Sequence, residues 1–234
     1  MMKRLSIVVC LGVCLVHGTS AAAESEHGPV TFSWEMAVAS KYLFQGIDYS
    51  DGNPVAQPEL SIEYRGFSLT SWSNVDLDER QFNETDLLFA YGLELGDLSV
   101  TPGYARYRYP NRDWEPSQEV YLDLSYATFV DLSLSSHYDF DAGEGAYFTL
   151  GVHRDVEISV GTFGAGSNLF YQRNYYEVNG IPSLEFTANY SRSIRSVSIT
   201  PSVSYFATWD NGDFKEQSAV PKTWLVSLTV GQSF

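Results

Sequence analysis

The feature that most constrains the fold is an alternation of apolar and polar residues with a period of two. Leu60 and Ile62 share one face of a short segment, and Glu59 and Glu63 share the other. Such alternation predicts a β-strand with one apolar and one polar face. Twelve segments of this kind follow one another: 32–40, 58–64, 67–74, 85–95, 98–107, 119–126, 131–138, 145–152, 156–163, 183–190, 197–206 and 223–234.

The connections between these segments alternate in length. Short turns are expected near residues 65, 96, 128, 154 and 194. Longer connections are expected over 44–56, 75–84, 108–117, 139–145, 164–182 and 208–221. Alternating short and long connections over an even number of strands are typical of outer-membrane barrels. The predicted fold is therefore all-β: a transmembrane antiparallel β-barrel of about 12 strands with both termini periplasmic.

The last segment carries the most specific signal. Five of its apolar residues share one parity and end in a terminal phenylalanine: Trp224, Val226, Leu228, Val230 and Phe234. An amphipathic final strand that ends in phenylalanine resembles the signal by which the barrel assembly machinery recognises its substrates. The alternative is a secreted β-sandwich that happens to end in phenylalanine, which the twelve alternating segments disfavour.

The first residues predict export. Lys3 and Arg4 precede a short apolar run, and small residues ending in Ala23 follow it. This is the pattern of a signal peptide, and the run is too short to cross a bilayer as a helix. We expect residues 1–23 to be removed and residues 24–234 to form one outer-membrane barrel domain of a Gram-negative bacterium. A lipoprotein signal ending at Cys14 is the less favoured alternative.

Composition narrows the function classes. Both cysteines lie in the signal segment, so the mature chain has no disulfide and no thiolate metal site. Removing the signal leaves 12 basic residues against 29 acidic ones, a formal charge of −17, which argues against nucleic acid as a partner. Aromatic residues make up 15% of the chain, yet its mean hydropathy is only −0.16. This combination suits strands of which only one face meets lipid.

Aromatic residues gather near the ends of the predicted strands. They lie near the long connections (Tyr42, Phe44, Trp72, Tyr104, Tyr138 and Tyr205) and near the short turns (Tyr64, Phe67, Tyr126 and Phe129). Two aromatic girdles are expected where strands cross the two membrane interfaces. A general preference of β-strands for aromatic residues is the plainer explanation.

The polar faces suggest where function resides. If the apolar faces meet lipid, ten acids point inward: Glu35, Glu59, Glu63, Asp86, Glu94, Glu119, Asp123, Asp131, Glu157 and Glu185. Unpaired charges are unfavourable in a dry interior, so these acids predict a water-filled lumen, and rings of carboxylates favour cations. Three alternatives stay open: some acids lie at the mouths, some pair with arginines from neighbouring loops, or side chains fill the interior.

The longest predicted connection is a second candidate element. The segment 164–182 mixes glycine, aromatic residues and Arg173. Long connections are often functional, so this one could fold inward and narrow the pore, with Arg173 facing the acidic wall. A plain external loop is an equally supported interpretation.

Other function classes are less well supported. Ser135 and His137 share a polar face, as in some barrel phospholipases, but a lipid hydrolase needs its nucleophile at the lipid boundary. We therefore expect no catalytic residue and no enzyme activity. The acids Asp139, Asp141 and Glu144 suit a solvated loop better than a Ca²⁺ site, so no metal or cofactor is predicted.

One segment resembles a known family. Residues 40–76 contain Tyr42, Phe44 and Gly46, then the run 50–52 with Pro54 and Gln57. This pattern resembles the N-terminal part of the TorF family of porin-like proteins, also described as Gcw-type conserved hypothetical outer-membrane proteins. Gln45 stands where the family pattern has an arginine. The resemblance implies a small porin-like barrel with no established substrate. The run 50–53 itself suits a tight loop.

The combined prediction is a porin-like channel for passive diffusion of small cationic or neutral solutes. Its expected partners are outer-membrane lipid and lipopolysaccharide, the barrel assembly machinery and the small solutes themselves. The sequence does not predict an oligomeric state. A structural barrel without a transport role is the main alternative, and a lipid hydrolase is a weaker one.

Overall fold

The computed structural model describes residues 30–208 and 222–234. The predicted signal peptide and most of the predicted connection 208–221 lie outside these residues. The described chain forms strands β1 (Val30–Ala39), β2 (Leu43–Phe44), β3 (Ile47–Asp48), β4 (Val55–Tyr64), β5 (Phe67–Asp76), β6 (Gln81–Tyr91), β7 (Leu93–Leu95), β8 (Leu98–Arg108), β9 (Ser117–Tyr126), β10 (Asp131–Asp139), β11 (Gly145–Ile158), β12 (Gly161–Tyr175), β13 (Val178–Gly180), β14 (Ser183–Ile194), β15 (Val197–Thr208) and β16 (Lys222–Ser233).

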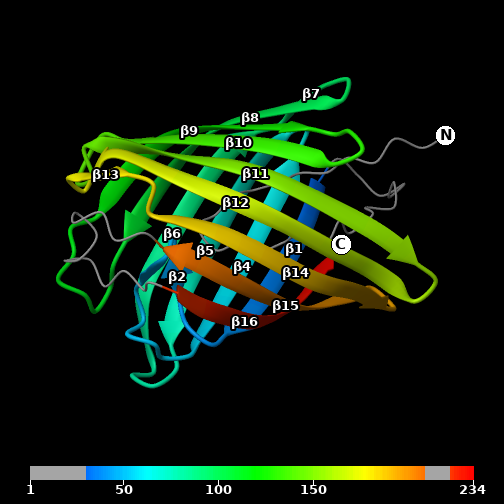
Figure 1. Cartoon of the computed structure of the whole chain (residues 1–234), viewed down its shortest axis with the longest axis horizontal. Coiled ribbons are helices and arrows are strands. Elements are labelled where there is room, and N and C mark those ends of the chain that lie inside the picture. The colour runs from blue at the N-terminus through cyan, green and yellow to red at the C-terminus, as the bar shows by residue number, and fades with distance from the viewer. Residues whose placement is uncertain (1–29, 209–221) are drawn as a thin grey trace.

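Twelve long strands close into one antiparallel barrel, which confirms the predicted fold class (Figure 1). Each long strand pairs with the next along the chain, and β1 pairs with β16 to close the sheet. Strand β7 prolongs β6 alongside β8, and β13 folds back on the end of β12. The two short strands β2 and β3 form a separate hairpin. No helix in the described part of the chain is long and apolar enough to cross a membrane.

The two faces of the barrel follow the predicted alternation. Outward positions carry exposed apolar side chains, among them Leu60, Ile62, Leu87, Phe89, Leu150, Phe163, Phe186, Trp224, Val226 and Leu228. Inward positions carry serine, threonine, glycine and acids. In water, this outer face would expose a large apolar surface to solvent, which is unfavourable. The exposed apolar belt therefore fits a surface that faces lipid.

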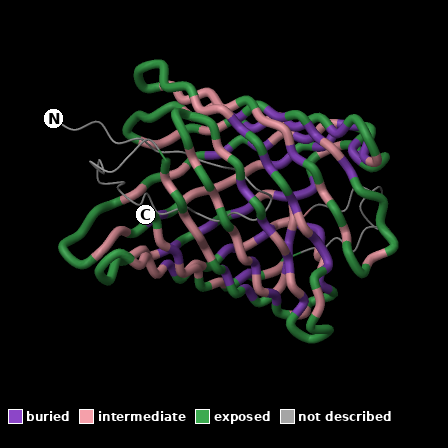
Figure 2. The backbone as a smooth tube through the Cα atoms, turned by 180° about the vertical axis from the view of Figure 1, so that it is seen from behind, coloured by how far each residue is buried: buried purple, intermediate pink, exposed green. Residues whose placement is uncertain are grey.

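The interior is not uniform along its length. At the short-turn end, inward-facing hydroxyl side chains are half-buried: Thr31, Ser33, Ser61, Ser68, Ser99, Thr101, Ser125 and Ser133. At the long-loop end, inward-facing polar side chains are fully buried: Gln57, Asn74, Ser117, Glu119, Asp139, Gln172 and Ser183. Figure 2 shows buried positions gathered toward the end opposite the C-terminus. The long-loop half of the lumen is therefore packed, whereas the short-turn half is open.

One turn and one strand differ from the prediction. No turn occurs at residues 154–155, because β11 continues to Ile158 and turns at 159–160. The predicted strand 156–163 is this hairpin, and most of the predicted loop 164–182 is strand β12. Its glycines look like loop residues but lie against a crowded inner wall. A Cβ on Gly164 would lie 2.6 Å from Asn189 Nδ2, and one on Gly166 would lie 2.8 Å from His153 Nδ1.

The closing strand joins the first strand at the short-turn end. The backbone N–H of Phe234 donates to the Phe32 carbonyl at 2.8 Å. The Phe234 side chain is 65% exposed and continues the outward face of Trp224, Val226 and Leu228. The side of the membrane on which this end lies remains a prediction.

Candidate functional site

The hairpin β2–β3 lies inside the long-loop end of the barrel. Leu43 is 1% exposed and Gln45, at the turn, is 2% exposed. Gln45 and Gly46 both have left-handed backbone conformations, with φ of 52° and 84°. Two consecutive positive φ values form the tight turn whose twist suits a two-residue hairpin. The first connection thus enters the lumen instead of projecting from it.

Contacts with distant strands hold the hairpin there. Gln172 Nε2 on β12 donates to Gln45 Oε1 at 2.7 Å. The Phe44 ring meets the Tyr147 ring of β11 edge-on, with centroids 5.5 Å apart. Around the hairpin base is a cluster of buried apolar side chains from six barrel strands, the hairpin and the residue before it: Ala39, Tyr42, Leu43, Val55, Trp72, Phe170, Phe206 and Leu225. Apolar burial of this extent stabilises the inserted position.

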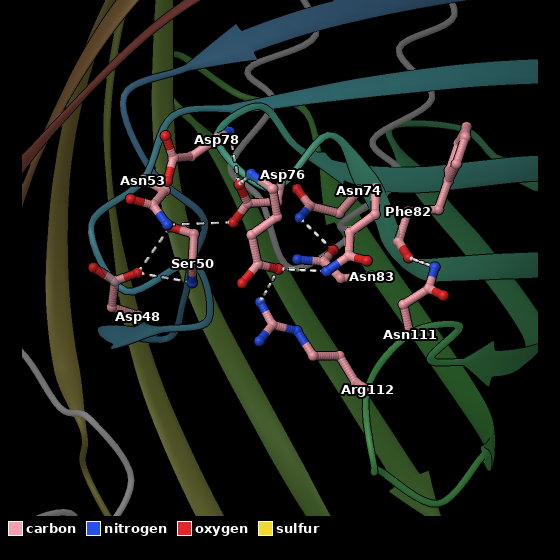
Figure 3. A network of polar contacts seen from close by, with 12 residues as sticks. Asp48, Ser50, Asn53, Asn74, Asp76, Asp78, Phe82, Asn83, Asn111 and Arg112 are labelled. Atoms are coloured by element: carbon pink, nitrogen blue, oxygen red, sulfur yellow. Dashed lines mark hydrogen bonds and ion pairs between the residues drawn. The ribbon is translucent and has the colours of Figure 1, made fainter.

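The motif at residues 50–53 shapes the loop that carries the hairpin (Figure 3). The Ser50 hydroxyl accepts from the Tyr42 backbone N–H at 2.9 Å and donates to Asp48 Oδ1 at 2.9 Å. Asn53 Nδ2 donates to Asp76 Oδ2 on the neighbouring strand end at 3.5 Å. Every one of these contacts is made within the protein, which fits the structural role expected of the motif. Burial, reinforced by the nearby Glu84 charge, also raises the pKa of the Tyr49 phenol in this loop.

A buried carboxylate on the barrel wall accepts several hydrogen bonds. Glu119, on β9, is fully buried. Its Oε2 accepts from the Tyr107 hydroxyl at 2.9 Å and from His137 Nδ1 at 3.1 Å, and its Oε1 accepts from the Tyr175 hydroxyl at 3.0 Å. Hydrogen bonds to the charged form stabilise a buried carboxylate. Strands β8, β9 and β10 and the end of β12 are thereby joined around one side chain.

His137 is the centre of an aromatic stack. Its ring lies between Tyr121, with centroids 5.0 Å apart, and Tyr147, with centroids 4.3 Å apart. Its Nε2 lies 3.8 Å from Asp123 Oδ1, on the side away from Glu119. This side chain has stacking partners on both faces and carboxylates near both nitrogens, so it fixes the geometry of the wall.

All ten predicted acids occupy inward-facing strand positions. The structure brings Asp86, Glu119 and Asp123 onto one wall, and it places Glu35 directly opposite Glu59 across β1 and β4. Asn168 Nδ2 donates to Glu185 at 3.0 Å on the other side of the lumen. The rest lie toward the short-turn end: Glu63, Glu94, Asp131 and Glu157. The acids therefore line the lumen at several levels and do not form a single ring.

Sequence reasoning missed Glu84. The predicted connection 75–84 is longer than the actual turn, which spans residues 77–80 because β5 and β6 continue to Asp76 and from Gln81. Glu84 is buried on the inner face two residues before Asp86. The shared parity of the two acids was the signal that could have identified it.

Arg173 does not face the lumen. It lies in β12 on the outward parity of Phe163 and Tyr171, and it is exposed. The expectation that it faces the acidic wall is wrong, because the segment forms a strand and not an inward loop. Every Lys and Arg in the described strands points outward: Arg106, Arg108, Arg154, Arg173, Arg192 and Lys222.

The expected aromatic girdles are only partly correct. Tyr64, Phe67, Tyr126, Phe129 and Tyr138 are exposed on the outer surface. In contrast, Tyr42, Phe44 and Trp72 surround the hairpin inside the barrel. Trp72 has inward parity on β5, and the other two belong to the inserted loop, so none of them faces lipid.

The features weighed for enzyme and metal chemistry have structural partners. Ser135 and His137 are both buried on the inner face, away from the lipid boundary. Asp139 accepts from the Ser117 hydroxyl and from the Asp141 backbone N–H at 2.9 Å. Within residues 30–208 and 222–234, no group of three or more His, Asp or Glu side chains is arranged to hold a metal ion.

Solved outer-membrane channels share this architecture. The KdgM porin aligns with a TM-score of 0.57 at 13% identity, over 87% of this chain and 99% of that one. The NanC porin aligns with a TM-score of 0.57 at 15% identity, over 86% and 98%. An outer-membrane channel from Pseudomonas putida F1 aligns with a TM-score of 0.50 at 9% identity, over 88% and 96%. At such identities the likeness establishes the fold alone, a closed antiparallel β-barrel like that of these channels.

No curated protein matches the chain in sequence. A family model does, and it confirms the Gcw-type resemblance, whereas the narrower TorF name stays a prediction. Residues 22–159 match the model described as "Bacterial protein of unknown function (Gcw_chp)", and the chain therefore belongs to the Gcw_chp family.

Proposed function

We propose that this protein is an outer-membrane channel for passive diffusion of small cationic or neutral solutes. The observation that carries the proposal is the sign of the inner wall. Ten predicted acids, together with Glu84, face the lumen, and every Lys and Arg of the described strands faces outward. Carboxylates in a narrow, low-dielectric passage attract cations and repel anions.

The same wall argues against anionic solutes. KdgM has been solved in complex with disordered oligogalacturonate, a polyanion. An anionic chain entering this barrel would pass the inward-facing acids Glu35, Glu59, Asp86 and Glu119 of β1, β4, β6 and β9. Like-charge contacts in a confined site cost several kcal/mol, about 4 at an effective dielectric of 20 and 4 Å. A shared fold does not fix the solute, and the acidic wall of this barrel favours a solute class other than polyanions.

The constriction in this proposal is the β2–β3 hairpin. Its turn residues Gln45 and Gly46 are buried against β12, β14 and β15. This hairpin takes the place that the sequence suggested for the segment 164–182. Small solutes would pass beside the hairpin, along the polar side chains that surround its turn.

Its cellular setting remains part of the proposal. A signal peptide over residues 1–23, assembly through the terminal strand and a periplasmic short-turn end form one consistent arrangement. The long-loop end would then face lipopolysaccharide. The exposed apolar belt and the porin-like fold support an outer-membrane location.

Planar-bilayer recording in a KCl gradient tests this function. Purified full-length mature protein should give channels whose reversal potential indicates preference for K⁺ over Cl⁻. Anion preference would contradict the proposed charge selectivity. Reproducible absence of channels, both in the native protein and in a variant whose hairpin 43–48 is replaced by two glycines, would favour a structural barrel without transport.

A further inference from the structure

Three buried carboxylates gather on the lumen wall beside the hairpin. Glu84 and Asp86 are successive inward residues of β6, and Glu119 lies on β9. Tyr107, on the intervening strand β8, pairs with Asp86, and its hydroxyl donates to Glu119 Oε2 at 2.9 Å. Tyr107 therefore lies between Asp86 on β6 and Glu119 on β9, because β8 pairs with both strands. We call these three residues the acidic box.

The acidic box lacks a basic partner at its centre. Glu119 contacts His137, but on the side of β10, away from β6. Among the described residues, no Lys or Arg forms an ion pair with Glu84, Asp86 or Glu119. Asp86 is 3% exposed, and its Oδ1 has no hydrogen-bond donor. A buried acceptor without a donor is expensive, so the site is suited to a ligand that donates to it.

A second observation comes from the indole of Trp72, on the neighbouring strand β5. Trp72 on β5 pairs directly with Asp86 across the sheet. Trp72 is 2% exposed, and its indole Nε1–H has no acceptor. Directly paired residues hold their Cβ atoms about 5 Å apart. A donor and an acceptor, both buried and both unused, therefore face the same small region.

These two atoms define the chemistry of a ligand. It must donate to Asp86 Oδ1 and accept from Trp72 Nε1, and its net charge must be positive to offset three carboxylates. A primary ammonium meets the first and third conditions, and a hydroxyl on the neighbouring carbon meets the second. The Tyr42 ring, with its centroid 5.7 Å from that of Trp72, adds an aromatic face that attracts cations.

We propose that the acidic box and Trp72 form a lumenal binding site for small amino alcohols. Asp86 and Glu84 bind the ammonium group, and Trp72 Nε1 donates to the neighbouring hydroxyl. The inference rests on the proposed channel function, because solutes reach the box only through the lumen. It narrows the solute class from cations in general to ammonium compounds that carry a hydroxyl.

Isothermal titration calorimetry on the full mature protein in detergent tests this site without requiring conduction. The probes are 2-aminoethanol, ethylammonium and ethylene glycol. We expect 2-aminoethanol to bind more tightly than ethylammonium and ethylene glycol not to bind. The isosteric variant Asp86→Asn should weaken 2-aminoethanol binding by about tenfold or more, the equivalent of one charge-assisted hydrogen bond. Trp72→Phe should remove the preference for 2-aminoethanol over ethylammonium.

Glu115→Gln, in the exposed loop between β8 and β9 and outside the lumen acids, is the matched control and should bind as the native protein does. Each variant is first shown to be folded by its heat-modifiable migration in gels. Equal binding by Asp86→Asn and native protein, or no binding of either amine, would overturn the site. Channels in KCl without amine binding would refute this inference alone. Amine binding without channels would refute the channel function and leave the site intact.

Discussion

The side chain of Gln172 donates to that of Gln45 at 2.7 Å, although the two residues lie 127 positions apart in the chain. Both are buried in the lumen, one on the wall and one at the turn of the inserted hairpin. This bond marks the place where the first connection meets the far wall of the barrel. The contact between Gln45 and Gln172 therefore holds the hairpin at the constriction.

Removing the hairpin should widen the passage. Replacing residues 43–48 with two glycines takes Leu43, Gln45 and Ile47 out of the lumen. Single-channel conductance in planar bilayers should rise, because side chains no longer occupy the long-loop half. The matched control replaces residues 77–80, an exposed turn of the same rim, with two glycines, and should conduct as the native protein does. A native conductance in the folded hairpin variant would rule out the constriction.

Gly46→Ala and Gly52→Ala form a matched pair. Both glycines have left-handed φ, 84° and 79°, so alanine costs about 1 kcal/mol at either position. Only at Gly46 would the new Cβ meet neighbours, at 2.7 Å from Thr208 Oγ1 and 2.8 Å from Ser183 Cβ. Gly46→Ala should therefore loosen the hairpin and speed its amide hydrogen exchange. Comparable exchange in the two variants would show that the packing at Gly46 is not what holds the hairpin.

Glu119→Gln should destabilise the barrel. The amide keeps the size of the carboxylate but replaces one of the two acceptor oxygens that now serve Tyr107, Tyr175 and His137 with an NH₂ donor. We expect a loss of about 2–3 kcal/mol in the free energy of unfolding, measured by urea denaturation in lipid vesicles. The exposed loop variant Glu115→Gln should change it by less than about 0.5 kcal/mol. Equal stabilities would mean that the phenols find other partners.

The facing pair Glu35 and Glu59 should contribute to ion selectivity. They lie opposite each other on β1 and β4 at the more open part of the lumen. The double variant Glu35→Gln/Glu59→Gln should lower the ratio of K⁺ to Cl⁻ permeability, read from the reversal potential in a KCl gradient. Glu79→Gln, on the exposed rim, is the control and should have a smaller effect. An unchanged ratio would place selectivity elsewhere in the lumen.

Phe234→Ala should separate assembly from stability. The Phe234 side chain is exposed on the outer surface, so the finished barrel loses little packing without it. Assembly in cells should fall if the terminal strand is the recognition signal, whereas refolding of purified protein into lipid should stay the same. Phe163→Ala, at an exposed outward position of β12, is the control. A defect of equal size in both variants would indicate loss of lipid contact instead.

The barrel itself could be predicted because its signal is local and repeated. Residues such as Leu60 and Ile62 alternate with Glu59 and Glu63, and a one-residue slip would turn every side chain to the wrong face. The period-two alternation also predicts that the acids face inward, and this prediction depends on no contact between distant segments.

Two parts of the site could not be predicted, for different reasons. The sequence predicts a loop where most of β12 lies, because Gly164 and Gly166 are poor strand formers. In the barrel a Cβ at these positions would lie 2.6 Å from Asn189 Nδ2 and 2.8 Å from His153 Nδ1, so glycine suits the crowded wall. The hairpin insertion depends on partners such as Gln172 and Phe206, which lie far along the chain. No local pattern reports whether a loop folds into a barrel or away from it.

The unequal filling of the lumen has an electrical consequence. The half-buried hydroxyls at the short-turn end leave room for electrolyte, whereas the packed hairpin level does not. A resistance concentrated in one short section carries most of the applied voltage. A charged blocker added on the short-turn side would pass through the open half of the barrel and still cross little of the field before it stops at the packed level. The distance that such a blocker travels and the share of the voltage that it crosses are therefore very different in this barrel.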